Sequence, residues 1–127
     1  MNSWYASLTL PPLTPPPWVF GPAWTILYTL IAVSIVVYYR ARPPEGRLVT
    51  TAVLAFHLLT NFIWSPLFFG LQRPGLALAD ILLLDVSLVA VILLFRRASR
   101  LAAALLAPYL LWVLFATYLN AGIVALN

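Results

Sequence analysis

The sequence has 127 residues, of which 64% are hydrophobic and only 8% are charged. Water-soluble domains typically have about 25% charged residues, so this composition, with a mean hydropathy of +1.00, excludes an ordinary soluble protein. One helical membrane crossing needs about 20 apolar residues. The length therefore allows four crossings with short loops and no separate soluble domain.

Cysteine is absent, which excludes disulfides, thiolate metal sites and cysteine nucleophiles within these residues. The single histidine, His57, makes a polyhistidine metal centre in one subunit unexpected. All seven basic residues are arginines that lie between hydrophobic runs. The positive-inside rule accounts for arginines in such places, so no nucleic-acid partner is expected.

Residues 1–17 contain aromatic side chains and five prolines but no charge and no long apolar core. This segment is not a signal peptide, because it has neither the basic region nor the apolar region of one. Its prolines favour extended backbone, and its aromatic rings suit the membrane–water interface. Two interpretations stay open on spacing alone: a stiff interfacial tail, or a lid over the mouth of a pocket.

Charged residues and turn formers divide the rest of the chain into four apolar runs, separated at 40–47, 70–75 and 96–100. Backbone within hydrocarbon must form its hydrogen bonds internally, and these runs are too long and too continuously apolar for barrel strands. We predict an all-α membrane bundle that forms one domain over 1–127. The expected helices span roughly 20–39, 49–69, 76–95 and 101–126.

The arginines also predict the orientation of the bundle. The loops at 40–47 and 96–100 carry three arginines each, whereas the turn between them carries one. With four crossings these two loops lie on the same side, which we expect to be the cytoplasmic face of a bacterial inner membrane.

Several polar residues inside the predicted spans need a partner. His57, Asn61 and Trp64 lie at i, i+4 and i+7, so they share one helix face. Asn61 either forms a hydrogen bond between helices or contacts a ligand, and periodicity leaves both interpretations open. Pro66, a few residues later, is expected to kink this helix.

Two acidic residues lie in the third predicted helix, five positions apart. This spacing separates Asp80 and Asp85 by about 140° around the helix, so they do not form a paired-carboxylate site on this helix alone. Asp80 is expected to be solvated or to pair with Arg73 near the membrane interface. Asp85 lies deeper, and we expect it to meet His57 or Asn61 across the bundle.

The last predicted helix carries a stripe of Tyr109, Val113, Ala116 and Asn120, which Trp112 and Phe115 flank. Small residues bordered by aromatic rings suit either close helix packing or a flat aromatic ligand. The pattern does not choose between them.

Three blocks of the sequence resemble one known family, the translocator protein family, also called the tryptophan-rich sensory protein or peripheral benzodiazepine receptor family. The first block runs from Trp4-Tyr5 through the prolines to WVF at 18–20 and AWTILY at 23–28. The others are NFIWSPLFFG at 61–70, and PYLLWV at 108–113 followed by FATYLN at 115–120.

This resemblance implies a tightly packed helical protein, usually a homodimer, that binds porphyrins and haem-like tetrapyrroles without an obligatory cofactor. In the family the pocket lies within one subunit's bundle, under a loop that residues 1–17 resemble. The resemblance therefore favours the interpretation of this segment as a lid. The expected lid residues are Trp4, Tyr5, Pro15, Pro16 and Trp18. With the polar residues above, it gives these candidate ligand-binding residues: Trp24, Tyr28, His57, Asn61, Trp64, Asp85, Trp112, Ala116, Asn120 and Ala121.

Two departures from the family pattern bear on the fold and the activity. Family members have five helices, whereas this sequence begins where the first would already have ended; we expect a misassigned or truncated start in preference to a four-helix variant. Ala121 stands where porphyrin-degrading members have a second tryptophan, so no enzymatic activity is expected.

The leading hypothesis is a tetrapyrrole-binding membrane protein that acts in transport or sensory regulation. The alternatives are a proton-coupled cation exporter that uses Asp85, and an enzyme that degrades porphyrin in light.

Overall fold

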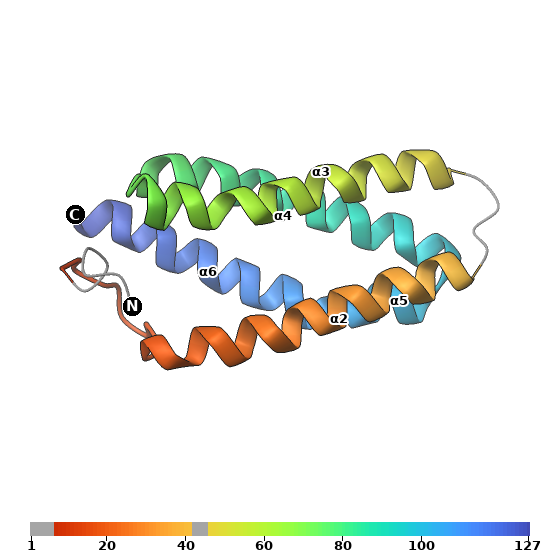
Figure 1. The fold of residues 1–127 in the computed structure, drawn as a ribbon, viewed down its shortest axis with the longest axis horizontal. Helices are drawn as coiled ribbons and strands as arrows, with labels where there is room; N and C mark the ends of the chain where they lie inside the picture. The colour runs from red at the N-terminus through yellow and green to blue at the C-terminus, as the bar shows by residue number, and fades with distance from the viewer. Residues whose placement is uncertain (1–6, 42–45) are drawn as a thin grey trace.

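The computed structural model describes residues 7–41 and 46–127, and these residues form helices with no strand. The all-α class is therefore confirmed. Along the chain (Figure 1), the elements are the 3₁₀ turn η1 (Pro17–Val19), α2 (Phe20–Arg40), α3 (Arg47–Ser65), the π-helical turn η2 (Pro66–Gly70), α4 (Pro74–Ala98), α5 (Arg100–Leu105) and α6 (Ala107–Leu126).

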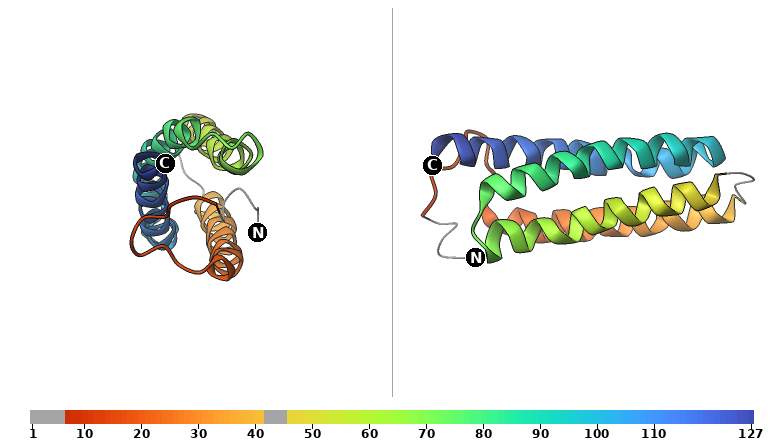
Figure 2. Two further views of the ribbon diagram at one scale, coloured as in Figure 1. Left: turned by 90° about the vertical axis from the view of Figure 1, so that its left-hand side faces the viewer. Right: turned by 90° about the horizontal axis from the view of Figure 1, so that it is seen from above.

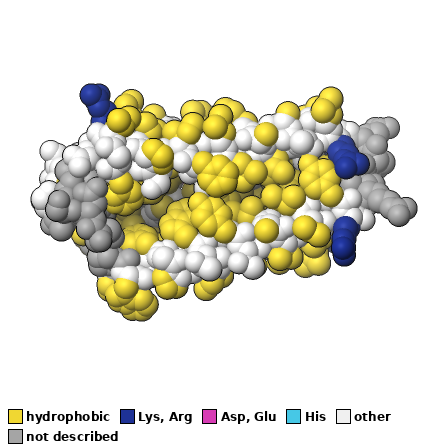
Figure 3. All heavy atoms as spheres, in the orientation of Figure 1, with side chains coloured by type: hydrophobic (Ala, Val, Ile, Leu, Met, Phe, Trp, Pro, Cys, Tyr) yellow, Lys and Arg dark blue, Asp and Glu magenta, His cyan; other side chains and the backbone are white. Residues whose placement is uncertain are grey.

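Four stretches of helix are long and apolar enough to cross a membrane, as the sequence predicts: Phe20–Arg40, Arg47–Gly70, Pro74–Ala98 and Arg100–Leu126. The bounds differ from the expected ones by a few residues at most. Arg40, Arg47, Arg96, Arg97 and Arg100 lie where consecutive helices end and begin at the same end of the bundle. Figure 3 shows basic side chains at this end.

Two proline positions change the predicted helices. At Pro66 the α-helix gives way to a π-helical turn, in which the Leu71 N–H donates to the Pro66 carbonyl at 2.8 Å. The last helix, expected to be continuous, is broken at Leu106 into α5 and α6. Pro108 has no N–H, and its ring would clash with the carbonyl four residues earlier, which explains the break.

The helices lie along an arc in the end-on view (Figure 2), with α2 and α3 at its two ends. Along this arc α3 packs on α4, α4 on α6, and α2 on α5.

Buried side-chain contacts join the helices at the arginine-rich end of the bundle. The rings of Tyr38 and Phe95 stack at 4.3 Å between their centroids, and both side chains are buried. Nearby, the Ser34 hydroxyl donates to the Ala102 carbonyl at 2.6 Å, a contact that the small alanine permits. These contacts hold α2 against α5 and α4, so that the opposite half of the bundle can remain hollow.

Candidate functional site

A cavity of about 300 Å³ lies between α2, α3, α4 and α6, in the half of the bundle away from the arginine-rich end. This volume is at the lower end of the usual range for ligand pockets, about 300–1,000 Å³. Its lining is mostly aromatic and aliphatic: Phe20, Trp24, Tyr28, Asn61, Trp64, Ser65, Phe68, Phe69, Ile81, Leu84, Trp112, Val113, Ala116, Leu119, Asn120 and Ile123.

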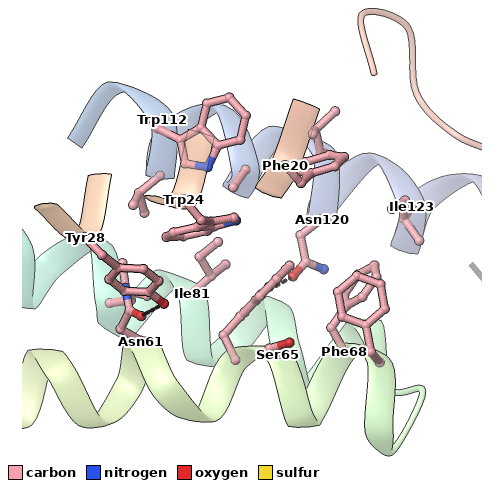
Figure 4. Close-up of a pocket in the computed structure, with 16 residues that line it drawn as sticks. Phe20, Trp24, Tyr28, Asn61, Ser65, Phe68, Ile81, Trp112, Asn120 and Ile123 are labelled. Carbon is pink, nitrogen blue, oxygen red and sulfur yellow. Dashed lines mark hydrogen bonds between the residues drawn. The ribbon is translucent and has the colours of Figure 1, made fainter. Parts of the chain in front are cut away.

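One wall consists of aromatic rings from α2 and α6. Phe20, Trp24 and Tyr28 lie four residues apart, so a single face of α2 presents them all to the cavity. Trp112 from α6 contacts Trp24 edge-on at 6.4 Å between ring centroids, and contacts Phe20 in the same way at 5.9 Å. Figure 4 shows these rings facing Asn61, Ser65 and Phe68 of the α3 side. The resulting space is mostly apolar.

Asn120 holds three segments together at the cavity wall. Its side-chain oxygen accepts a hydrogen bond from the Trp64 indole nitrogen at 3.0 Å, and its amide donates to the Pro74 carbonyl at 2.9 Å. These bonds fix the Trp64 ring, which stacks on Phe68 at 5.1 Å. By contrast, the buried indole N–H of Trp112 has no hydrogen-bond partner among the described residues.

Asn61 joins α3 to two other helices and also lines the cavity. Its side-chain oxygen accepts from the Tyr28 hydroxyl at 2.9 Å, and its amide donates to the Tyr109 hydroxyl. The two interpretations of Asn61 are therefore compatible, since the residue connects helices and faces the cavity at once.

The cavity wall is uncharged and opens to one side. None of the described lining residues is acidic or basic, so a bound group would meet aromatic faces and a few amide and hydroxyl groups. Figure 3 shows the hollow between α3 and α2, edged by hydrophobic side chains.

The N-terminal segment crosses the hollow end of the bundle and is attached to α6. Thr9 and Asn127 form two reciprocal hydrogen bonds, at 3.0 and 2.9 Å, and the Tyr118 hydroxyl donates to the Pro12 carbonyl at 2.7 Å. Pro11 is buried and lies against Gly122, where an added Cβ would be 2.6 Å from the proline Cβ. Leu8 packs against the small core cluster of Phe68, Ala77 and Ile123.

The part of this segment that lies over the bundle differs from the lid residues predicted from the sequence. Residues 8–12 make the contacts with the bundle. Pro15 and Pro16 lead into α2, and Trp18 is 73% exposed, a position typical of an aromatic anchor at the membrane interface. Trp4 and Tyr5 lie outside the described residues.

Most of the predicted ligand-binding residues line the cavity: Trp24, Tyr28, Asn61, Trp64, Trp112, Ala116 and Asn120. Three do not. His57 is fully buried one turn away from the cavity, Asp85 lies between α4 and α6, and Ala121 is exposed. Ala121 follows Asn120 by about 100° around the helix, which carries its side chain away from the cavity.

The predicted partners of both aspartates were wrong. Asp85 meets neither His57 nor Asn61 but accepts a hydrogen bond from the Thr117 hydroxyl at 2.7 Å. His57 instead contacts Ser87, which lies about 200° around α4 from Asp85. Asp80 is only 9% exposed, and within the described part of the chain it forms no ion pair with Arg73.

Sequence reasoning missed Ser65 and several apolar lining residues, mainly Phe20, Ile81, Leu84, Leu119 and Ile123. Phe20 had a usable signal, because it lies one turn before Trp24 on the same face. Ile81 and Leu84 had no clear signal, since α4 is apolar nearly all round and its polar residues Asp80, Asp85 and Ser87 lie on more than one face.

The fold and cavity together define a polytopic helical membrane protein with an aromatic, uncharged cavity inside the bundle. The sequence model of the TspO/MBR family matches residues 1–126, and the chain belongs to this family.

Curated relatives carry consistent names. The chain is 42% identical over 128 residues to the tryptophan-rich protein TspO of Archaeoglobus fulgidus, covering 100% of this chain and 82% of that protein. It is 37% identical over 119 residues to the human translocator protein, covering 92% and 70%. Identity to the tryptophan-rich sensory protein of Cereibacter sphaeroides is 36% over 126 residues, covering 99% and 78%.

Proposed function

We propose that this membrane protein binds tetrapyrroles, or other flat apolar ligands, in the cavity between α2, α3, α4 and α6, and that it acts in transport or sensing. The observation that carries the proposal is the aromatic, uncharged lining, which offers ring faces to a flat ligand. Within the described residues, the hollow is open between α2 and α3.

Titration with protoporphyrin tests the proposal. We expect a saturable shift of the porphyrin Soret band together with quenching of tryptophan fluorescence, because Trp24, Trp64 and Trp112 line the cavity. Absence of both signals up to high micromolar porphyrin would contradict it.

Variants locate the binding. Trp24→Phe and Asn61→Leu are each expected to weaken porphyrin binding, by about three- to tenfold for the ring contact. Trp18→Phe is the control, because this tryptophan is exposed outside the cavity. Equal affinity in all three variants would remove the assignment.

The alternative functions have less support from the geometry. Asp85 does not line the cavity, so nothing there favours a cation exporter. Porphyrin-degrading members have a second tryptophan at the position of Ala121. Ala121 is an exposed alanine, so it does not provide such a side chain to the cavity. Loss of the porphyrin spectrum in light but not in the dark would favour the degrading enzyme.

We further propose that the protein is a homodimer in a bacterial inner membrane, with its arginine-rich end in the cytoplasm. The positive-inside rule supports this orientation, and it places the N-terminal segment and the hollow end of the bundle on the outer side.

A further inference from the structure

A continuous series of hydrogen bonds runs from the cavity wall into the middle of the bundle. It joins Tyr28 to Asn61, Asn61 to Tyr109, Tyr109 to the Nε2 atom of His57 at 2.9 Å, and the Nδ1 atom of His57 to Ser87 at 3.0 Å. The five side chains come from α2, α3, α4 and α6, and His57, Tyr109, Asn61 and Ser87 are buried. None of the buried members can exchange its partner for bulk water.

The inner end of the series sets the direction of its donors. The Leu84 carbonyl can only accept, and it lies 3.0 Å from the Ser87 hydroxyl; with the hydroxyl proton donated there, the Ser87 oxygen accepts from an N–H at Nδ1 of His57. No carboxylate contacts His57 within the described chain, and a charged imidazole without one is strongly disfavoured in a membrane interior. In the neutral ring Nε2 then carries the lone pair and accepts from the Tyr109 hydroxyl.

The same direction continues to the cavity. The Tyr109 oxygen accepts from the Asn61 amide, and the Asn61 oxygen accepts from the Tyr28 hydroxyl. The Tyr28 proton is thereby committed, and its oxygen offers only lone pairs to the cavity. Asn61 keeps one amide hydrogen but is 6% exposed, whereas Tyr28 is 42% exposed. Of these two residues, Tyr28 is therefore the one more open to a ligand.

We propose that His57 is a positioning residue that sets the donor-to-acceptor direction of the hydrogen bonds ending at Tyr28. The site would then select flat ligands with an N–H or O–H donor opposite Tyr28. With the proton at Nδ1, the series makes Tyr28 an acceptor. With the proton at Nε2, every bond would reverse, the Asn61 amide would flip, and Tyr28 would present a donor instead. The selection of ligands rests on the proposed binding function, whereas the state of His57 does not.

The single histidine makes this state directly measurable. Protein labelled with ¹⁵N-histidine gives one imidazole, whose two nitrogen chemical shifts distinguish the tautomers. We expect the Nδ1–H tautomer in the ligand-free protein. An Nε2–H tautomer, or a doubly protonated ring at neutral pH, would overturn the proposal whether or not any ligand binds.

Carbazole and dibenzofuran test the selectivity, because these flat tricycles have nearly the same shape and only carbazole has an N–H donor. We expect the wild-type protein to bind carbazole about fivefold more tightly, as one net hydrogen bond implies. Tyr28→Phe should abolish the difference. Equal affinity of the wild-type protein for both compounds would overturn the proposal, even if protoporphyrin binds as proposed.

The contribution of His57 is separated by a double-mutant cycle. His57→Leu removes the acceptor for Tyr109 and should abolish the carbazole preference, whereas His57→Gln retains an acceptor oxygen and should restore most of it. In a Tyr28→Phe background, His57→Leu should change the preference no further. A preference that survives His57→Leu in folded protein would overturn the role of His57; if that variant does not fold, the tautomer measurement still decides.

Discussion

Trp64 and Trp112 face the same cavity but differ in how their indole nitrogens are satisfied. Trp64 donates to Asn120, whereas the buried Trp112 N–H has no partner in the part of the chain that the structure describes. Burying a donor without a partner costs free energy, and removing that donor recovers this cost. Removing a donor that forms a hydrogen bond instead leaves its acceptor without a partner. The two residues therefore form a matched pair in which a similar change of ring has different effects.

Replacing each tryptophan by phenylalanine should separate these effects. We expect Trp64→Phe to lower the free energy of unfolding by about 1 kcal/mol more than Trp112→Phe, because only the first breaks a hydrogen bond. Unfolding in mixed detergent micelles, followed by circular dichroism, measures the difference. An equal loss in both variants would show that the Trp64–Asn120 bond contributes no net stability.

At the scale of single elements, the helices are predictable because charge is so costly in hydrocarbon that charged residues mark nearly every loop. Proline chemistry also indicated the change at Pro66, although the pattern did not show that the helix continues as a π-helical turn. The break at Leu106 was missed, because no charge or glycine accompanies Pro108.

The site was less predictable than the helices. Face and spacing were sufficient to place Asn61 and Trp64 together, since both depend on one helix alone. The partners of Asn61, Asp80 and Asp85 depend on the rotation and register of neighbouring helices. In helices that are apolar nearly all round, such as α4, the sequence does not fix that rotation.

Gly122 is the point where the N-terminal segment approaches α6 most closely. We expect Gly122→Ala to displace this segment, because the new Cβ would lie 2.6 Å from the Cβ of Pro11, whose ring cannot rotate aside. Hydrogen–deuterium exchange at the Thr9 amide, which donates to Asn127, should become faster.

Gly75→Ala provides the control, because an added Cβ there has no neighbour within 4 Å and should leave the Thr9 amide protected. Protection that persists in Gly122→Ala would mean that the segment accommodates the methyl group without leaving α6.

For the molecule as a whole, the arginine distribution predicts the direction of insertion. The absence of cysteine makes single cysteine variants clean reporters. In bacterial cells, a membrane-impermeant maleimide should label Leu71→Cys from outside and Ala41→Cys only after permeabilisation, because these exposed residues lie at opposite ends of the bundle. The reverse labelling pattern would place the arginine-rich end outside the cytoplasm.

The central claim is that the ligand occupies the cavity within the bundle, and two alanines of α6 test it most directly. Ala116 lines the cavity, whereas Ala121 on the same helix is exposed away from it. Each variant is titrated with protoporphyrin, and binding is measured by the quenching of tryptophan fluorescence. Ala116→Phe places a ring in the cavity, whereas Ala121→Phe leaves the cavity unchanged. We predict that Ala116→Phe loses at least about tenfold in affinity while Ala121→Phe binds as the wild-type protein does. Equal binding by both folded variants would contradict the claim.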